Sequence, residues 1–301
     1  MTNYHPPQTH NMQGKIVIIC GPTASGKSQY ALDLAINAGN GVIINADSMQ
    51  VYRFLPILTA QATAQQQANC PHKLYSIINP DEHFSVARWL ELAKKEIEQA
   101  LTNNQTPIIV GGTGMYISSL INGLAQVPAV PLSIVDSLTT QTTNLSQIEL
   151  HQLLMQCDPA AAAKIKVGDR QRALRAIAVY KATGQALTAW QTQTTPYYPR
   201  TQLYIIGILP DRELVYRNCN SRFLEMLATG AIEEVRWLTQ HYPHQSYPKV
   251  LGLNEICQYL DGFLTWGNMI AQAQQYTRNY AKRQYTWFRN QITFYDMIVT
   301  N

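Results

Sequence analysis

The chain has 301 residues, of which 46% are hydrophobic and only 14% carry a formal charge. This composition excludes a globally disordered chain and suffices for one large domain or two ordinary ones. No apolar run approaches the ~20 residues that a membrane span needs, and residues 1–14 contain no apolar stretch of the kind that a signal peptide has. The sequence therefore argues against membrane, secreted and fibrous proteins and predicts a cytoplasmic protein with no membrane partner.

Positive charge is concentrated in the second half of the chain. Residues 1–150 hold 7 Lys/Arg against 9 Asp/Glu, whereas residues 151–301 hold 16 against 10. A basic half suits a polyanionic partner, although a mildly basic enzyme without such a partner has the same balance. The five cysteines form no C-x-x-C pair, so we expect free thiols rather than a zinc or redox motif.

The first half of the chain alternates strand and helix patterns. Residues 1–14 are polar and lack periodicity, which predicts a disordered tail. Short β-branched runs then predict buried parallel strands; these are residues 15–20, 41–45 and 107–110. Helical patterns follow each strand or precede the next; these are residues 27–37, 84–102 and 111–120. The alternation predicts an α/β fold, a doubly wound parallel sheet of the P-loop NTPase type.

The pattern changes between residues 125 and 200, where two helices are expected at 145–165 and 168–183 and no buried strand appears. We expect a helical insertion there. A buried strand returns at 203–209, followed by a helix capped by Asp211 and a helical remainder broken near 241–252. The expected domains are a tail (1–14), a core (15–124), the insertion (125–200), and the rest of the core with basic C-terminal helices (201–301).

A phosphate-binding loop follows the first predicted strand. It matches G-x-x-x-x-G-K-[ST] completely and opens a helix, as the motif requires. Its residues are Gly21, Pro22, Thr23, Ala24, Ser25, Gly26, Lys27 and Ser28. The glycines let successive N–H groups face phosphate oxygens, the helix N-terminus favours an anion, and the Ser28 hydroxyl is placed for Mg²⁺. The motif indicates a phosphorylated ligand without identifying it.

One motif of nucleotide hydrolases is missing. Those enzymes hold Mg²⁺ with an aspartate that closes a buried strand, but the strand at 107–110 runs into Gly111-Gly112-Thr113 instead. Only Asp47 stands at a strand end. By residue type alone, Asp47 fits a magnesium ligand, a catalytic base or a helix cap equally well.

Two groups of basic residues lie on predicted helices. Arg172 and Arg175 are three residues apart and share one face of a helix in the insertion, whereas Leu174 lies on the other side. Near the C-terminus, four side chains fall within about 60° of one another on one helix face. They are Arg278, Lys282, Tyr285 and Arg289. Such faces bind phosphates of a nucleic acid or small ligand, or are merely solvated.

Five motifs, in this order, resemble those of the bacterial-type tRNA dimethylallyltransferases, also called tRNA isopentenyltransferases. They are GPTASGKS (21–28), DSMQVYR (47–53), VGGTGMY (110–116), DRQRALR (169–175) and YAKRQYTWFR (280–289). The resemblance runs over most of the chain, from about Lys15 to Arg289. It implies transfer of a dimethylallyl group from dimethylallyl diphosphate to the exocyclic amine of the adenine 3′ of the anticodon in tRNA, with release of diphosphate.

The resemblance also implies the roles of individual residues. The phosphate loop, residues 21–28, would cradle the isoprenoid diphosphate together with Arg222, and Ser28 would hold a Mg²⁺ cofactor. Asp47 would be the catalytic base, with Thr113 near the reacting centre. The insertion would bind the anticodon stem-loop, and the family suggests a monomer. The residues implied in tRNA binding are Asp47, Ser48, Met49, Gln50, Thr113, Gln171, Arg172, Ala173, Leu174, Arg175, Lys282 and Arg283.

The sequence departs from the family pattern at several places. Leu58 stands where the family usually has Gly, and Gln61 where it usually has Lys. Ala178 replaces an acid, and Leu253-Asn254 replaces an aromatic and a basic residue. We expect these changes to alter RNA contacts more than the phosphate site.

Three other functions remain open at this stage. A small-molecule kinase shares the loop and the sheet but has no need of an insertion of ~75 residues. A prenyltransferase that acts on free adenine nucleotides would need neither the insertion nor the basic excess. A relative that only binds RNA is disfavoured because Lys27, Ser28, Asp47 and Thr113 are all present.

Overall fold

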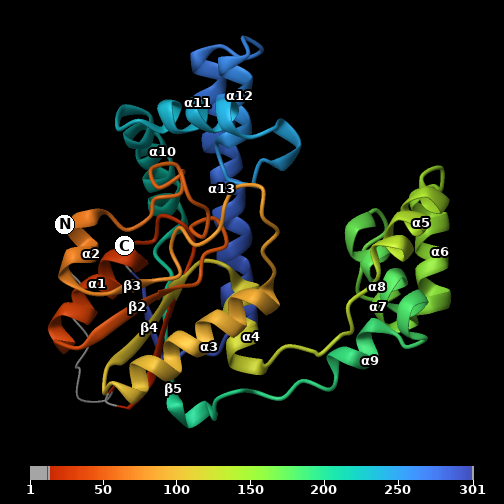
Figure 1. Cartoon of the computed structure of the whole chain (residues 1–301), viewed down its shortest axis with the longest axis horizontal. Helices are drawn as coiled ribbons and strands as arrows, with labels where there is room; N and C mark the ends of the chain where they lie inside the picture. The colour runs from red at the N-terminus through yellow and green to blue at the C-terminus, as the bar shows by residue number, and fades with distance from the viewer. Residues whose placement is uncertain (1–11, 13, 300–301) are drawn as a thin grey trace. The chain divides into compact units, whose positions relative to one another are not determined.

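The computed structural model describes residues 12 and 14–299 (Figure 1). The disordered tail expected at residues 1–14 lies outside them except for Met12 and Gly14. Met12 is buried against the first strand and helix, so at least this residue belongs to the core.

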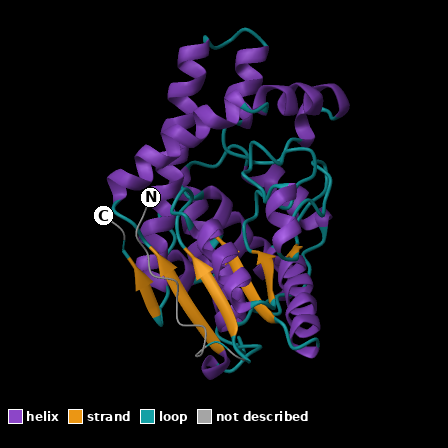
Figure 2. Ribbon diagram, turned by 90° about the vertical axis from the view of Figure 1, so that its left-hand side faces the viewer, coloured by secondary structure: helices purple, strands orange, loops and turns teal. Residues whose placement is uncertain are grey.

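Six parallel strands form one sheet in the order β3-β2-β4-β1-β5-β6, and Figure 2 shows their arrowheads pointing toward one edge. The strands are β1 (Ile16–Cys20), β2 (Gly41–Asn45), β3 (His72–Lys73), β4 (Thr106–Gly111), β5 (Leu203–Ile208) and β6 (Asp296–Ile298). Every residue of β1, β2 and β5 is buried, as their runs rich in Ile and Val predict. The predicted fold class is confirmed.

The two edge strands were not expected. β3 has two half-buried residues and β6 has three residues that are mostly exposed. Neither contains the continuous apolar run that reveals a buried strand in a sequence. They form because β2 and β5 offer unpaired backbone groups at the edges of the sheet.

Helices of the core surround the sheet and extend beyond its carboxyl edge (Figure 1). They are α1 (Lys27–Ala38), α2 (Ala64–Asn69), α3 (Val86–Thr102), α4 (Gly114–Asn122), α10 (Arg212–Ala228), α11 (Ala231–His241), α12 (Leu253–Leu260) and α13 (Trp266–Gln291). Side-chain oxygens of Ser85, Asp211 and Thr265 cap α3, α10 and α13. Asp211 is the cap that the sequence predicts. A second apolar cluster joins α10–α13 to Leu55 and Leu58.

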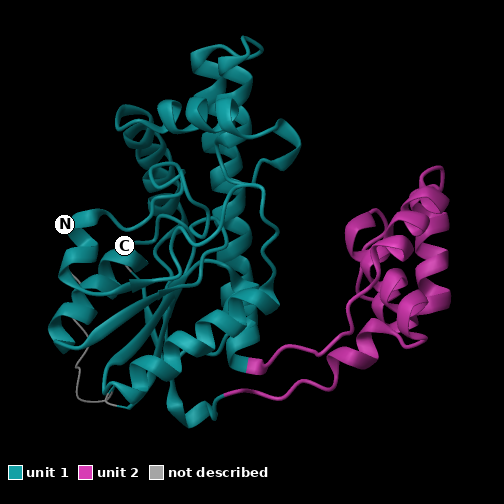
Figure 3. Ribbon diagram, viewed as in Figure 1, with its two compact units in different colours: residues 1–121, 198–301 teal, residues 122–197 magenta. Residues whose placement is uncertain are grey.

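Residues Asn122–Tyr197 form a compact unit separate from the rest (Figure 3). It begins at residue 122, where 125 was expected, and ends at residue 197, where 200 was expected. Its own apolar core includes Leu138, Leu150 and Leu154. Its helices are α5 (Leu132–Thr142), α6 (Gln147–Cys157), α7 (Pro159–Ala162), α8 (Arg170–Thr183) and α9 (Leu187–Gln191).

Two details of the insertion differ from the expectation. The single helix expected at 145–165 is broken, because Asp158 ends α6 and caps α7 at Pro159. Helix α5 was not expected; threonines are poor helix formers, but here Thr139, Thr140 and Thr142 each donate to the carbonyl four residues before. Helix α8 ends at Gly184, whose left-handed φ of 71° makes it the expected stop.

Candidate active site

The phosphate loop follows β1, and its shape depends on both of its glycines. A Cβ on Gly21 would lie 2.2 Å from the carbonyl oxygen of Ile208, so no side chain fits there. Gly26 has a left-handed φ of 88° and opens α1 without any side-chain cap, which leaves the first amides of that helix available to a ligand. Ser25 Oγ is buried and has no hydrogen-bond partner. A buried hydroxyl in this state favours an acceptor such as a phosphate oxygen.

Two cations converge on this loop. Lys27 is only 8% exposed, and its Nζ donates to the carbonyl oxygen of Pro22 at 3.2 Å. Burial lowers the pKa of Lys27 to about 8, although the carboxylate of Asp47 acts in the opposite direction. Arg222 reaches the loop from α10 and donates to Thr23 Oγ1, and burial lowers the pKa of its guanidinium too. Two desolvated cations side by side favour an anionic ligand.

Asp47 stands at the end of β2 in a turn that neighbouring side chains hold. Its Oδ1 accepts the Met49 N–H at 3.0 Å, and its own N–H donates to Asn45 Oδ1 at 2.8 Å. Asn45 is completely buried and also donates from Nδ2 to the carbonyl oxygens of Asp47 and Leu74. The turn therefore fixes one carboxylate oxygen and leaves the partly exposed Asp47 facing the site.

Thr113 lies beside that turn, in the loop after β4. Its Oγ1 accepts the Ser48 N–H at 2.9 Å and donates to Ser48 Oγ at 3.1 Å. The hydroxyl of Tyr280, on α13, hydrogen-bonds to Thr113, and burial raises the pKa of Tyr280 with Asp47 adding to the effect. The predicted pair Asp47 and Thr113 is thus brought to one place by the ends of β2 and β4.

A pocket of about 70 Å³ connects the cations to the carboxylate. Its polar lining includes Lys27, Ser28, Arg222, Asp47 and Tyr280. The remaining wall is largely apolar and comes from α10, the loop before α12 and the segment after β2; it includes Met49, Leu58, Phe223, Met226 and Leu251. The arrangement suits a ligand with an anionic head and a short apolar tail.

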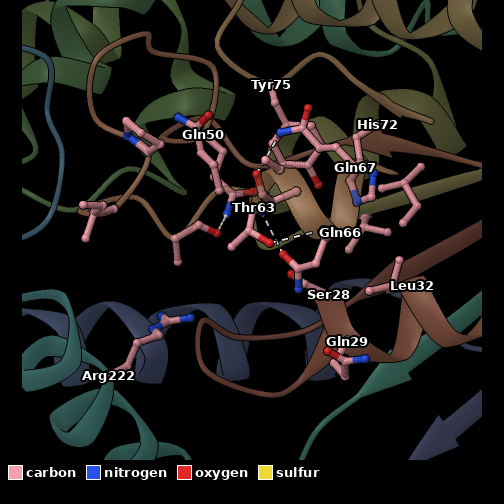
Figure 4. A pocket seen from close by; sticks show the side chains of 18 of the residues that line it. Ser28, Gln29, Leu32, Gln50, Thr63, Gln66, Gln67, His72, Tyr75 and Arg222 are labelled. Carbon is pink, nitrogen blue, oxygen red and sulfur yellow. Dashed lines mark hydrogen bonds between the residues drawn. The ribbon is translucent and has the colours of Figure 1, made fainter. Parts of the chain in front are cut away.

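A wider cavity of about 1100 Å³ opens beside this pocket (Figure 4). The two share Ser28, Gln50 and Arg222 among their lining residues. Glutamines, His72 and Tyr75 line much of the wider cavity, and Figure 4 shows Gln50, Gln66, Gln67, His72 and Tyr75 across it from Gln29 and Arg222. It is the larger opening next to the phosphate loop.

The donor set near Ser28 fits a magnesium ion that arrives with a diphosphate. Ser28 is exposed, and Ser28 and Asp47 both line the small pocket. Among the described residues, no group of three or more His, Cys, Asp or Glu is placed to hold a metal. Mg²⁺ is commonly held by one or two protein oxygens, with substrate phosphates and water completing the shell.

The residues predicted to bind tRNA fall on two helices, on the turn after β2 and, for Thr113, on the loop after β4. On α8, Gln171, Arg172 and Arg175 are exposed, whereas Ala173 is buried in the core of the insertion and Leu174 packs against that core. Arg172 pairs with Asp169, which caps α8, at 2.8 Å. On α13, Lys282 and Arg283 are exposed, but Arg278 of the predicted basic stripe donates to Asn220 and Gln275.

Comparison with known proteins decides the family. A family model described as IPP transferase matches residues 50–291. The chain belongs to the IPP transferase family. A tRNA dimethylallyltransferase of Wolbachia pipientis subsp. Culex pipiens is 42% identical over 284 residues, which cover 93% of this chain and 94% of the relative. The predicted resemblance is therefore confirmed, and so is the predicted class of enzyme, a prenyltransferase.

Solved structures agree with this assignment. A tRNA isopentenylpyrophosphate transferase from Bacillus halodurans is 34% identical, with a TM-score of 0.66, over 94% of this chain and 90% of the other. A eukaryotic dimethylallyltransferase acting on tRNA gives a TM-score of 0.78 at 25% identity, over 94% and 73%. In the part of this family member that the structure describes, no helix is both long and apolar enough to cross a membrane.

Most departures from the family pattern are accommodated inside this chain. Leu58 and Leu253 are buried in the apolar cluster of α10–α13, and Ala178 is buried in the core of the insertion, where an acid would be desolvated. Gln61 donates to Tyr52 O and Thr59 Oγ1 and accepts from Ser76 Oγ. Asn254 remains exposed.

The structure adds polar residues to the site that the sequence analysis did not single out. Asn45 fixes the turn of Asp47, Tyr280 contacts Thr113, and Gln284 contacts two loops at once. Tyr280 and Gln284 lie in the quoted motif YAKRQYTWFR, so their position was visible but their contacts were not. Gln50, one of the residues implied in tRNA binding, donates from Nε2 to the carbonyl oxygens of Thr59 and Ala60.

Proposed function

We propose that this chain transfers a dimethylallyl group from dimethylallyl diphosphate to the exocyclic amine of the adenine 3′ of the anticodon in tRNA, releasing diphosphate. One observation carries the proposal: a single small pocket contains the desolvated cations Lys27 and Arg222, a short apolar wall and the carboxylate of Asp47. The names of the similar proteins and the large share of this chain that they match support it.

On the donor side, the phosphate loop binds the diphosphate. Lys27 and Arg222 neutralise its charge, so that the bond between C1 of the allyl group and the bridging oxygen breaks with both electrons leaving on diphosphate. Ser28 would hold Mg²⁺, which adds further charge neutralisation to the leaving group. The open cavity beside Ser28 gives the donor a route to the loop. The apolar wall excludes water from the allylic cation that develops.

On the acceptor side, the adenine amine needs alignment and a base because its lone pair is conjugated into the ring. As the new bond from the amine nitrogen to C1 forms, Asp47 accepts the proton that the nitrogen loses. Thr113 and Ser48 hold the turn that carries Asp47. The adenine reaches this pocket only by leaving the stacked bases of the anticodon loop.

Binding of the anticodon stem-loop uses exposed basic side chains. Arg172 and Arg175 on α8 and Lys282 and Arg283 on α13 are exposed and suited to phosphate contacts. Within the turn after β2, the side-chain amide nitrogen of Gln50 is bonded to the carbonyl oxygens of Thr59 and Ala60. Gln50 therefore contacts a nucleobase edge through its side-chain oxygen, or only after those two hydrogen bonds break. We place the reaction in the cytoplasm and expect a monomer to carry it out.

The test is transfer of labelled dimethylallyl diphosphate, with Mg²⁺, to an anticodon stem-loop that carries adenine 3′ of the anticodon. AMP and a stem-loop without that adenine serve as parallel acceptors. Label on the adenine stem-loop alone is the expected result. Label on AMP would replace the proposal with prenylation of free nucleotides, and bound RNA without label would leave an RNA-binding relative.

A further inference from the structure

Gln284 lies between the phosphate loop and the loop after β4, and both ends of its amide are hydrogen-bonded. It is 6% exposed, on the inner face of α13. Its Nε2 donates to the carbonyl oxygen of Gly112 at 2.7 Å, and its Oε1 accepts the Thr23 N–H at 2.8 Å. The amide is packed tightly against the loop, because a Cβ on Gly112 would lie 2.4 Å from Nε2.

The two groups that Gln284 joins belong to the two sides of the reaction. Thr23 is part of the phosphate loop, and its hydroxyl accepts from Arg222. Gly112 precedes Thr113, which accepts the Ser48 N–H next to Asp47. Hydrogen bonds of Gln284, the backbone from Gly112 to Thr113 and the Thr113–Ser48 hydrogen bond therefore connect the donor loop to the acceptor turn.

The backbone alone does not make this connection. The ladder between β1 and β4 ends at the pair Cys20 and Gly111. Beyond it Gly112 still lies beside the Gly21 carbonyl oxygen, but the described residues form no further backbone hydrogen bond between the two loops, and Gln284 supplies the next link from a third element. A glutamine that only paired unsatisfied backbone groups could bond two groups of the same loop. Gln284 instead bonds one group in each of the two loops.

We propose that Gln284 is a positioning residue that fixes the distance between the diphosphate loop and the acceptor turn. The inference rests on the proposed function. Group transfer requires C1 of the donor and the amine nitrogen to be held close and aligned, and a displacement of ~1 Å can cost ~10²-fold in rate. Lys27, Ser28 and Arg222 hold the diphosphate without contacting Gln284, so its loss affects the chemical step more than donor binding.

Two variants separate positioning from folding. Gln284→Leu fills the space but leaves the Thr23 N–H and the Gly112 carbonyl unpaired; we expect kcat to fall by about 30- to 100-fold, with KM for dimethylallyl diphosphate within about threefold. Gln284→Glu keeps an acceptor for Thr23 but, when ionised, opposes the Gly112 carbonyl. Its protonated form regains a donor, and burial favours protonation, so kcat relative to the parent enzyme should rise as pH falls from about 8 to 6.

Gln272→Glu, an exposed amide on the same helix, is the matched control and should show neither effect. Hydrogen exchange of residues 21–28 gives a readout that does not depend on transfer, and Gln284→Leu should speed exchange at Thr23 by about tenfold or more.

Four results are possible. The positioning role is supported if Gln284→Leu lowers kcat, keeps KM and speeds hydrogen exchange of the loop, and if Gln284→Glu regains activity as pH falls. A parent enzyme that labels no RNA, combined with faster exchange in Gln284→Leu, ends the proposed function but keeps the positioning role. The positioning role is overturned if kcat and hydrogen exchange of Gln284→Leu are both the same as those of the control Gln272→Glu. If Gln284→Leu unfolds, Gln284→Glu decides, and a deficit independent of pH overturns the inference.

Discussion

The phosphate loop and helix α8 of the insertion both present positive charge, but in opposite surroundings. Lys27 is 8% exposed, and burial lowers its pKa to about 8. Arg172 keeps 76% of its side chain exposed and pairs with Asp169 across one turn. A buried cation acts strongly on one bound anion, whereas an exposed one is screened by water and salt.

The difference separates two tasks within one chain. Catalysis needs charge fixed close to a leaving group in a site from which water is excluded. Binding of a long polyanion needs several exposed charges, each of modest effect, that follow its backbone. Substitutions in the two regions should therefore differ in kind: in the core they change turnover and pH dependence, and in the insertion they change RNA affinity and salt dependence.

The largest effect is expected at Asp47. Asp47→Asn keeps an oxygen for the Met49 N–H but cannot accept the proton of the amine, so kcat should fall by about 10²- to 10⁴-fold while RNA binding changes by less than about threefold. Single-turnover transfer and filter binding measure the two quantities. Asp81→Asn, at an exposed carboxylate, is the control. Collapse of RNA binding with unchanged turnover of bound RNA would remove the base role.

The next effect tests whether the insertion folds around its own core. Leu154 is completely buried there, so Leu154→Ala should cost about 2–5 kcal/mol of the free energy of unfolding of that unit. RNA affinity should fall, while the affinity for dimethylallyl diphosphate should not. Calorimetry measures the unfolding of Leu154→Ala. Leu132→Ala, which truncates an exposed leucine of the same unit, is the control. A parallel loss of donor affinity would contradict separate cores.

The pH dependence of donor binding tests the buried cation. Because burial lowers the pKa of Lys27 to about 8, the amine is charged below that pH and loses its proton above it. Donor affinity should be flat below about pH 7 and weaken by up to about tenfold per pH unit above 8, and binding above pH 8 should take up a proton. Titration calorimetry in buffers of different ionisation enthalpy measures both. Lys27→Arg stays charged and should lose the dependence; if it keeps the dependence, another group titrates.

The smallest effect is expected at the exposed arginines of α8. Arg175→Ala should weaken RNA binding by a few-fold and reduce the slope of log affinity against log salt by roughly 0.7–0.9. Turnover of bound RNA should stay unchanged. Binding of the anticodon stem-loop at several salt concentrations measures the slope, with Lys164→Ala, at another exposed cation of the insertion, as the comparison. An unchanged slope would place Arg175 outside the interface.

Much of the core could be predicted because its determinants are local. The runs at β1, β2 and β5 are short, buried and rich in Ile and Val, and the phosphate loop is a contiguous motif whose glycines are fixed by close approach and left-handed backbone. The edge strands β3 and β6 escaped prediction because pairing with a neighbouring strand decides them, and helix α5 because it packs Leu138 into the apolar core of the insertion. Leu58 and Ala178 likewise became interpretable only once their burial was known.

The sequence by itself determined the fold class, the phosphate loop, the strand-end position of Asp47 and the family, because each rests on runs and motifs that are contiguous within themselves. Only the tertiary structure decided what surrounds them. Lys27 and Arg222 lie 195 positions apart and meet because α10 packs over the loop after β1. Thr23, Gly112 and Gln284 come from three distant segments, and no periodicity or spacing encodes a hydrogen bond across 261 residues. Such contacts exist only after the sheet and the C-terminal helix have packed together.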